Sequence, residues 1–475
     1  CMKGGFMLLN ISDWSRPVTI KWLASLALPG LLYVLLTTYG DPASLNPNMI
    51  MFLCVTLWAV CAWAMNTLND VAVGLLLPML YVAFCGVKQG VVFRPWLGEV
   101  AIIAIGGFVL GKIMGASGLG KRIALASVRS MGGSFVGAMA GLGIGAAIIA
   151  PLVPSIMGKA AIFTAIAVAL CDALDFRARS REASAVLLAA CVAVGATKLC
   201  YLTGAGDLVM GMALADKVMG THTMWMDYAI HNFVPGMLYM IMSIAIVLLV
   251  LRTKTSKESL KSSVEMAYAE LGPMTPEQKR ATALLVFTLI MLATDKLHGF
   301  SAGGVLMFIT ALAFVPGISL MDGKRLASVN FSPIFFIMGC MSIGAAGGAL
   351  GVTDWLAGLV LPLLNGYGPT FTGVASYWVG VGLNFLLTPL AATSTITSPL
   401  VTLGMELNME PRILYYAFQY GLDNIIFPYE YALYLYFYSS GYINFRDMAL
   451  VLAVRMVLAA VFVGLIAIPW WSFII

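Results

Sequence analysis

Long apolar blocks separated by short polar breaks follow one another along the chain. Eleven of these blocks are long enough to cross the ~30 Å hydrocarbon core of a bilayer as a helix. They lie near residues 20–39, 48–65, 71–87, 98–118, 184–219, 229–251, 281–297, 300–320, 333–350, 411–438 and 447–472. A transmembrane β-barrel would show short segments of alternating hydrophobicity instead. The pattern predicts an all-α polytopic membrane protein with about 11 transmembrane helices.

Two further apolar regions, 132–174 and 366–408, are interrupted in the middle by Pro, Ser and Thr. Non-helical backbone at membrane depth is tolerated only where protein or a watery cavity surrounds it. We therefore expect each region to form a re-entrant hairpin, whose two half-spans enter and leave on the same side of the membrane.

Charged residues are scarce and unevenly distributed. Only 10% of the residues are charged and 61% are hydrophobic; an ordinary soluble domain carries about 25% charged residues, so a water-soluble enzyme is excluded. With eleven spans and a cytoplasmic N-terminus, 18 Lys and Arg residues fall inside and 5 outside, as the positive-inside rule requires. This orientation predicts a multi-pass protein of the cell membrane with its C-terminus outside and the polar stretch 252–280 in the cytoplasm as an amphipathic linker.

Glycines recur at one spacing in two distant parts of the chain. Four of them are repeated 233 residues later: Gly106, Gly111, Gly115 and Gly118 as Gly339, Gly344, Gly348 and Gly351. A second match, at an offset of 238, pairs Pro151-Leu152 and 155–158 with Pro389-Leu390 and 393–396, which predicts an insertion of five residues. The first glycine span ends inside and the second outside, so the halves have opposite orientations. Such an inverted repeat is typical of secondary transporters.

Small polar residues mark the break in each hairpin. Ser155 lies in the first break, and hydroxyl side chains gather in the second, at Thr393, Ser394, Thr395 and Thr397. A hairpin tip leaves unpaired N–H groups at half-helix N-termini, which suit a carboxylate or another oxyanion. The hydroxyls would add donors to such a site; in the alternative interpretation each bonds only to the preceding helical turn.

Three stretches carry a resemblance to a known family. They are Gly106-Gly107-Phe108 through Gly118-Leu119 with Lys121-Arg122-Ile123-Ala124, Leu271-Gly272-Pro273-Met274 with Glu277-Gln278-Lys279-Arg280, and Gly339 through Gly351 with Trp355-Leu356-Ala357. Over about 20–470 the chain resembles the divalent-anion/sodium symporter (DASS) family of dicarboxylate, citrate and sulfate transporters. The resemblance implies an elevator-type transporter that forms a homodimer, in which a scaffold holds mobile transport domains.

The resemblance also implies domain boundaries. The scaffold would comprise 1–130 and 281–365, and the linker 252–280 would join the two halves. The transport domain would comprise 131–251, with the hairpin 132–174 and a broken helix near 203–207, and 366–475, with the hairpin 366–408 and a broken helix near 427–431.

The chain departs from the family pattern at the residues that would bind ions. The family's hairpin tips carry Ser-Asn-Thr, which hold substrate carboxylates and sodium. Here the first tip reads Ser155-Ile156-Met157, and the second reads Thr393-Ser394-Thr395 after Ala392. Loss of both Asn side chains removes amide oxygens that would coordinate a hard cation. The altered motif therefore argues against sodium binding in the first repeat. The resemblance implies no other cofactor.

Two lysines lie close to the first break and its neighbouring broken helix. Lys159 follows the first tip, and Lys198 precedes the break that contains Gly204. Because an ionisable group at this depth costs several kcal/mol unless it is paired or hydrated, these lysines are candidates to replace sodium beside the anion. Asp207 and Glu430 are candidate counter-ions or proton carriers.

The cations within the membrane also have a plainer interpretation. In it Lys159 snorkels from the hairpin, and Lys112 and Arg455 do likewise near span ends. The aromatic run from Tyr429 to Tyr438, with Tyr431 in it, is interpreted as packing or an interface belt.

The function predicted is secondary active transport of a small di- or tricarboxylate or a similar divalent oxyanion. Sodium-independent exchange or proton coupling, of a sulfonate or sulfate among others, remains an alternative, and a non-cycling receptor or an anion channel is the rival class. The three histidines lack metal-ligand spacing, and no nucleophile or acid/base pair stands out. No metal centre, enzyme activity or nucleic-acid partner is expected; the expected partners are a small anion, the lipid bilayer and a second copy of the chain.

Overall fold

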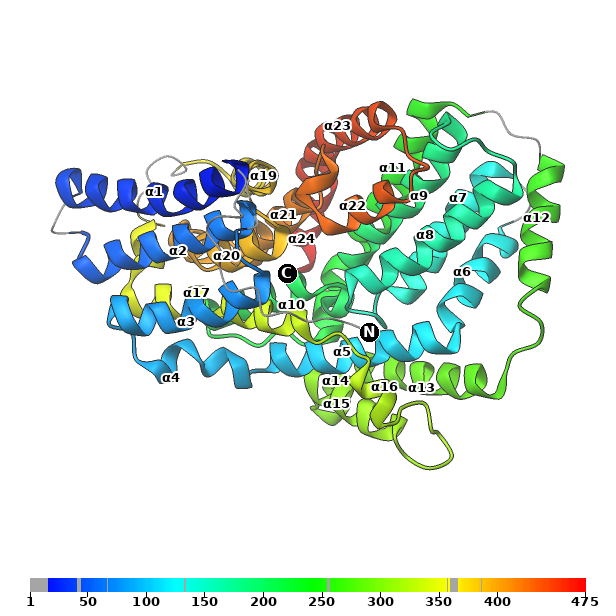
Figure 1. The fold of residues 1–475 in the computed structure, drawn as a ribbon, viewed down its shortest axis with the longest axis horizontal. Coiled ribbons are helices and arrows are strands. Elements are labelled where there is room, and N and C mark those ends of the chain that lie inside the picture. Colours follow the sequence, from blue (N-terminus) through cyan, green and yellow to red (C-terminus); the bar gives the residue numbers. More distant parts are fainter. Residues whose placement is uncertain are drawn as a thin grey trace.

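The computed structural model describes residues 16–40, 44–65, 67–131, 134–253, 257–356, 358, 366–385 and 387–475. Throughout these residues the regular structure is helical, with no strand. Ala357, one of the residues quoted for the family resemblance, lies outside them. Figure 1 shows α1 to α4 and α17 gathered at one end of the molecule, and α6 to α9, α11 and α12 at the other.

The N-terminal helices pack against the start of the second half of the chain. They are α1 (Arg16–Tyr39), α2 (Pro47–Met65), α3 (Asp70–Cys85), α4 (Gln89–Val92) and the 3-10 helix η2 (Arg94–Leu97). α3 packs along α17 (Ser332–Leu350). At their crossing a Cβ on Gly339 would lie 2.4 Å from the Cα of Gly74, so only glycine permits this approach of the two backbones.

The first repeat consists of a long helix, a hairpin and a broken helix. Its elements are α5 (Glu99–Ser117), α6 (Leu119–Ser130), α7 (Phe135–Ile149), α8 (Ile156–Ala173), α9 (Arg181–Lys198), η3 (Leu202–Gly204), α10 (Gly206–Met219) and α11 (Trp225–Leu251). α7 and α8 form the predicted hairpin, with the tip between Ile149 and Ile156. The predicted span 184–219 is two helices separated at 199–205, a break that overlaps the one expected near 203–207.

A middle segment joins the two repeats. It contains α12 (Lys257–Ala269), α13 (Pro276–Ala293), α14 (Asp295–His298), α15 (Ala302–Ala313) and α16 (Gly323–Ala327). The helix predicted in the linker 252–280 is α12, and the last residues of that stretch already form the first turn of α13.

The second repeat has the same order of elements after α17. They are α19 (Pro369–Asn384), α20 (Pro389–Glu406), α21 (Pro411–Leu422), η4 (Pro428–Glu430), α22 (Ala432–Ser439), α23 (Phe445–Phe462), the π-helical η5 (Val463–Ala467) and α24 (Ile468–Ile474). α19 and α20 form the second hairpin. The predicted span 411–438 is interrupted at 423–431, a stretch that includes the expected break near 427–431.

Equivalent residues cap equivalent helices in the two repeats. Gly118 ends α5 at a φ of +70°, and Gly351 ends α17 at +76°, a backbone conformation that favours glycine. Ser155 caps α8 and Thr388 caps α20, each accepting the N–H three residues on. These pairs share the offset of 233, so the predicted offset of 238 and its five-residue insertion are wrong.

Gly107 allows the first hairpin tip to reach α5. A Cβ at this position would lie 2.4 Å from the Cγ of Pro154. In the second repeat a Cβ at Gly344 of α17 would lie 2.7 Å from the Cδ2 of Leu214 in α10. The glycine rows of α5 and α17 therefore provide smooth surfaces where other helices approach closely.

Residues of the family resemblance meet at one corner. Arg122 of α6 donates from Nε to the Oε1 of Gln278 at 2.9 Å and from Nη2 to the carbonyl oxygens of Leu271 and Gly272 at 2.8 and 2.9 Å. Gln278 donates in turn to the carbonyl oxygen of Ser117 at 3.1 Å. The end of α5 and the start of α13 are thereby joined.

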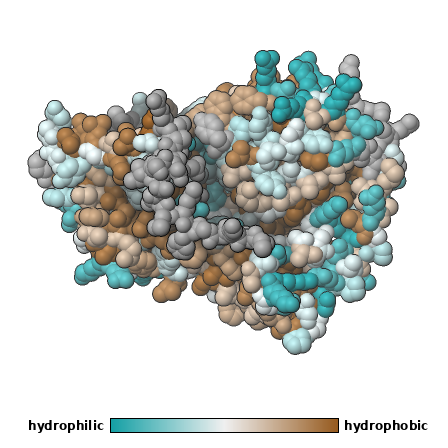
Figure 2. All heavy atoms as spheres, viewed as in Figure 1, coloured by the Kyte–Doolittle hydropathy of each residue, from teal (hydrophilic) through white to brown (hydrophobic). Residues whose placement is uncertain are grey.

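Large apolar side chains remain on the surface of the helices. In Figure 2 they cover much of the part where α1 to α3 lie, and hydrophilic side chains gather mainly toward the opposite end. Five of the described helices are long and apolar enough to cross a membrane, namely Thr19–Tyr39, Glu99–Ser117, Trp225–Leu251, Ser332–Leu350 and Phe445–Ile474. This agrees with a polytopic membrane protein; the total of about 11 spans stays a prediction.

Candidate functional site

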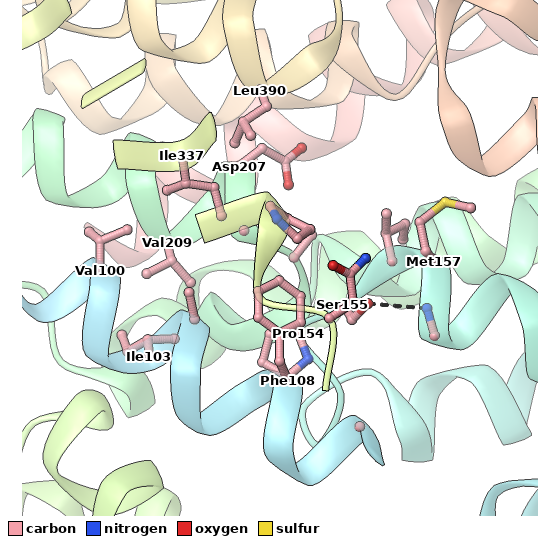
Figure 3. Close-up of a pocket in the computed structure, with 18 of the residues that line it drawn as sticks. Val100, Ile103, Phe108, Pro154, Ser155, Met157, Asp207, Val209, Ile337 and Leu390 are labelled. Atoms are coloured by element: carbon pink, nitrogen blue, oxygen red, sulfur yellow. Dashed lines mark hydrogen bonds between the residues drawn. The ribbon is translucent and has the colours of Figure 1, made fainter. Parts of the chain in front are cut away.

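A cavity of about 470 Å³ lies where the two repeats meet. Its walls are α5, the N-terminal ends of α8, α10 and α20, and the segment that leads into α17. Most of its lining is apolar, including Phe108, Met157 and Ile337, and Figure 3 shows these side chains around Ser155 and Asp207. An apolar enclosure with a few convergent polar groups is the usual form of a small-molecule site.

Helix N-termini face this cavity from both repeats. Ser155 to Gly158 line it at the start of α8, Gly206 and Asp207 at the start of α10, and Pro389 and Leu390 at the start of α20. The first N–H groups of a helix have no partner within the helix and carry partial positive charge. The cavity is thus suited to an oxyanion.

Of the three residues expected at the first tip, Ser155 is the capping residue of α8, and Ile156 and Met157 already belong to that helix. The Oγ of Ser155 accepts the N–H of Gly158 at 3.2 Å, the dashed line in Figure 3. Ile156 and Met157 form the first turn of α8 and line the cavity. The structure brings Ser155 and Asp207 together in its wall.

Lys159 lies behind this turn and is fully buried. Its Nζ donates to the carbonyl oxygen of Gly204, in the break between α9 and α10. A Cβ at Gly204 would lie 1.9 Å from the carbonyl oxygen of Lys198, so glycine is required there. Because Lys159 points to this break and is inaccessible, the snorkelling interpretation is wrong for it.

A hydroxyl also ties the first tip to the broken helix. Thr203 donates from Oγ1 to the carbonyl oxygen of Pro151 at 2.8 Å and accepts from the Nε1 of Trp225 at 3.0 Å. The tip and the break therefore form one rigid unit around Lys159.

Lys198 is held by one carboxylate and one phenol. Its Nζ lies 2.9 Å from the Oδ2 of Asp207 and 3.2 Å from the Oη of Tyr431. Lys198 is fully buried, and the other two side chains are 5% and 7% exposed and line the cavity. Asp207 thus forms an ion pair with Lys198. The contact with Tyr431 links the two repeats and was hidden within an aromatic run that predicted only packing.

The second hairpin tip does not lie where the match between the two halves of the sequence predicts it. It lies between Asn384 and Pro389, and Thr388 is its capping residue. Thr393 and Thr395 lie beyond the first turn of α20, so placing the tip at 393–395 is wrong. At the offset of 233 the residue equivalent to Lys159 is Ala392, which is buried and apolar.

The hydroxyls of α20 serve mainly the helix itself. Ser394 donates to the carbonyl oxygen of Ala391 at 2.7 Å, and Thr395 donates to the same oxygen at 3.1 Å, as the alternative interpretation expected. Thr393 accepts from the Nε2 of Gln419 at 3.1 Å. Thr397 is buried, and its hydroxyl has no partner within the described residues. None of these four lines the cavity.

Glu430 has a different role from the one expected. Its Oε1 accepts the backbone N–H groups of Phe427 at 2.8 Å and Ile426 at 3.4 Å. Glu430 therefore holds the backbone of the second break and does not pair with a lysine in the described part of the chain. Its Oε2 is buried without a partner among the described residues.

Arg455 and Asp423 form a fully buried ion pair in the second repeat. The Nη1 of Arg455 also donates to the carbonyl oxygen of Asp423 at 3.0 Å and to the Oη of Tyr434 at 2.8 Å, and its Nε donates to the Oγ of Ser243 at 2.9 Å. The snorkelling interpretation is therefore wrong for Arg455. Lys112 is half-buried and lines the cavity from α5.

Asn384, which sequence reasoning did not single out, joins the second tip to the second break. Its Nδ2 donates to the carbonyl oxygens of Leu422 at 2.8 Å and Asn424 at 3.2 Å. The only feature of the sequence that could have identified Asn384 as a functional candidate is its position at the end of a half-span. Within the described part of the chain, no three His, Cys, Asp or Glu side chains are placed to hold a metal ion.

The chain is similar to known membrane proteins over most of its length. A family model described as the sodium:sulfate symporter transmembrane region matches residues 20–475. A "membrane protein" of Cupriavidus necator is 22% identical over 368 residues, which are 72% of this chain and 70% of the relative. The inner membrane protein YbhI of Escherichia coli is 19% identical over 382 residues, 78% of this chain and 79% of the relative.

Two further similarities concern a plant protein and a solved structure. The chloroplastic dicarboxylate transporter 1 of Spinacia oleracea is 23% identical over 281 residues, 58% of this chain and 48% of the relative, so the match spans about half of that protein. The crystal structure of the Alcanivorax borkumensis YdaH transporter has a TM-score of 0.53 at 15% identity and covers 97% of this chain and 99% of the other. At that identity it indicates a shared fold alone.

Proposed function

Because this membrane protein belongs to the family of sodium:sulfate symporter transmembrane regions, we propose that it is a secondary active transporter of a small di- or tricarboxylate or a similar divalent oxyanion. The cavity between the two repeats is its substrate site. In this proposal the two hairpins and the two broken helices move together against a scaffold, as an elevator, and the chain forms a homodimer in the cytoplasmic membrane.

The observation that carries the proposal is the set of positive groups around one cavity. Three helix N-termini reach it, and the buried ammonium of Lys159 lies just behind the first of them. Lys198 is neutralised by Asp207, whereas Lys159 has only the carbonyl of Gly204 among its described partners. An anion in the cavity would supply the missing negative charge, because a buried charge is costly without one.

The same geometry favours a transporter that does not need sodium at its first site. A hard cation prefers carbonyl and carboxylate oxygens, and here the Gly204 carbonyl and the Asp207 carboxylate are already bound by lysine ammonium groups. We therefore place sodium-independent exchange ahead of sodium symport. Proton coupling through Asp207 or Glu430 is the second candidate, since the Oε2 of Glu430 is buried without a described partner.

Counterflow in proteoliposomes tests this function. Vesicles loaded with unlabelled succinate, citrate or sulfate are diluted into the same labelled anion, with either sodium or choline as the external and internal cation. We expect saturable uptake of at least one of these anions in choline. Uptake that collapses without sodium would exclude the exchanger, and flux that rises without saturation would indicate a channel.

A pH gradient imposed on the same vesicles separates exchange from proton coupling. An exchanger accumulates label only as far as internal anion is available, whereas a proton-coupled carrier also accumulates label in vesicles without internal anion. Absence of saturable uptake under every condition would overturn the proposed function.

A further inference from the structure

Tyr431 connects the second repeat to the charged centre of the first. It follows η4, and its backbone caps the N-terminus of α22. Its side chain is 7% exposed and forms part of the cavity wall. Its Oη lies 3.2 Å from the Nζ of Lys198, and that nitrogen lies 4.8 Å from the centre of the phenol ring.

The direction of this hydrogen bond follows from the chemistry of the two groups. A lysine ammonium has three hydrogens to donate and accepts none, so the Oη of Tyr431 must be the acceptor. Asp207 receives a second hydrogen of the same ammonium at 2.9 Å. Tyr431 therefore keeps its own hydroxyl hydrogen, and no acceptor for that hydrogen is found in the portion of the chain that the structure describes.

The free hydrogen belongs to a side chain in the cavity wall, where none of the described residues is placed to accept it. A buried donor without a partner costs free energy, and an oxyanion in the cavity would remove this cost. Acceptance from a cation also polarises the phenol, because hydrogen bonds in a chain strengthen one another. We propose that Tyr431 is a binding residue for the carried oxyanion and donates its hydroxyl hydrogen to an anionic oxygen of the substrate.

This assignment rests on the proposed function and gives Tyr431 and Lys159 different roles in binding the anion. Lys198 and Asp207 together carry no net charge, so Tyr431 supplies a directed hydrogen bond, whereas Lys159 supplies the charge. The substrate oxygen that faces Tyr431 must be a strong acceptor, such as a carboxylate or sulfonate oxygen. An amide in the same place would bind less well, because a neutral oxygen makes a weaker hydrogen bond.

The test compares purified wild type with Tyr431→Phe by thermal shift and by isothermal titration with succinate, citrate and sulfate. Tyr416→Phe is the matched control, since Tyr416 is buried in the same repeat but bonds to His231 and does not line the cavity. We expect Tyr431→Phe to weaken binding of the anion that wild type binds by roughly tenfold to a hundredfold. The control should change it by less than about twofold.

A second variant separates direct donation from a structural role and does not remove the hydroxyl. Genetic incorporation of 3,5-difluorotyrosine at position 431 keeps the ring and the contact with Lys198 but gives a more acidic phenol. Anion binding should then be retained at low pH and lost as the pH rises through the ionisation of that phenol, because a phenolate cannot donate. The same replacement at Tyr416 should leave the pH profile unchanged.

The outcomes separate the inference from the function on which it rests. If wild type binds an anion and Tyr431→Phe binds it equally tightly, the role of Tyr431 is overturned and the transport function stands. The same holds if the fluorinated variant keeps the pH profile of wild type over a pH range in which its phenol ionises, as followed by absorbance. If wild type binds none of the probes and shows no counterflow, the proposed function fails.

Discussion

The two broken helices differ in where each holds its positive charge. In the first repeat Lys159 and Lys198 lie directly behind the cavity wall and contact Gly204, Asp207 and Tyr431. In the second repeat the cation is Arg455, which comes from α23 and pairs with Asp423. None of the partners of Arg455 lines the cavity.

This difference shows that the two repeats share a backbone arrangement but not the charged residues beside the cavity. The caps Ser155 and Thr388 are equivalent, yet Lys159 has the apolar Ala392 as its counterpart. The first half therefore places two lysines behind the cavity wall, and the second half places Tyr431 in that wall and a buried ion pair away from it. Variants of equivalent residues should reveal this asymmetry.

The largest effect is expected from breaking the ion pair of the second repeat. Asp423→Asn leaves the fully buried Arg455 without its counter-charge, and loss of one partner of such a pair costs about 3–5 kcal/mol. We expect a large fall in the melting temperature without anion. The fraction that remains folded should bind anion with unchanged affinity, measured by titration. Weakened affinity would mean that the second cation also acts on the cavity.

Lys159→Ala should have the next largest effect, and on binding. Removal of one member of a buried charged contact costs about 2–5 kcal/mol, so anion transport should be lost at substrate concentrations that saturate wild type. Added sodium should restore part of the anion transport if a sodium ion can occupy the space left by the Lys159 side chain. Lys112→Ala is the control for a cavity cation outside the hairpin. Unchanged transport kinetics in Lys159→Ala would remove this lysine from the site.

Ser155→Ala and Thr388→Ala compare the two capping residues. Each loses a cap worth about 1 kcal/mol to its helix, so both should lower the melting temperature slightly and similarly. Only Ser155 lines the cavity, so only Ser155→Ala should also weaken anion binding, by about 1 kcal/mol. Equal effects on affinity would show that the second tip binds the anion as well.

The smallest effect is expected for Glu430→Gln. The amide oxygen can still accept the N–H groups of Phe427 and Ile426, so the break should be preserved and exchange should change by less than about twofold. Counterflow between pH 6 and 8 measures it. A strongly reduced transport rate that no longer varies with pH would favour proton coupling at Glu430 over exchange.

Much of the backbone could be predicted from the sequence because membrane helices have strict requirements. Apolar blocks must be long, and Pro and Gly mark the places where a helix breaks. The positions of both broken helices and of the first tip at Ser155 follow from these rules. The repeat was visible because Gly118 and Gly351 each end a helix at positive φ.

The position of the second tip could not be predicted because proline has more than one use. Pro151 lies in the first tip before α8, whereas Pro389 is the first residue of α20, a position that proline favours. Matching the two prolines therefore shifted the alignment by five residues, and it directed attention to Thr393 and away from Thr388.

The pairing of side chains was harder to predict from the sequence than the course of the backbone. Lys198 has Asp207 nine residues along the chain, but Tyr431 comes from 233 residues away. Arg455 lies on α23 and Asp423 directly follows α21, and no local pattern specifies how these helices pack. Contacts between the repeats depend on how the repeats dock, and periodicity within one helix carries no information about that.

The covalent attachment of Lys159 has a consequence for the energetics of the whole transport cycle. A bound sodium ion can dissociate together with the substrate and leave a neutral site, but the lysine side chain stays in place and loses its charge only by releasing a proton. As long as Lys159 keeps that proton, the unloaded protein would carry an uncompensated charge through hydrocarbon, which is costly, while the anion-loaded protein would not. One anion is therefore expected to return only when another replaces it, so that a single side chain would make the outward and inward fluxes stoichiometrically dependent on each other.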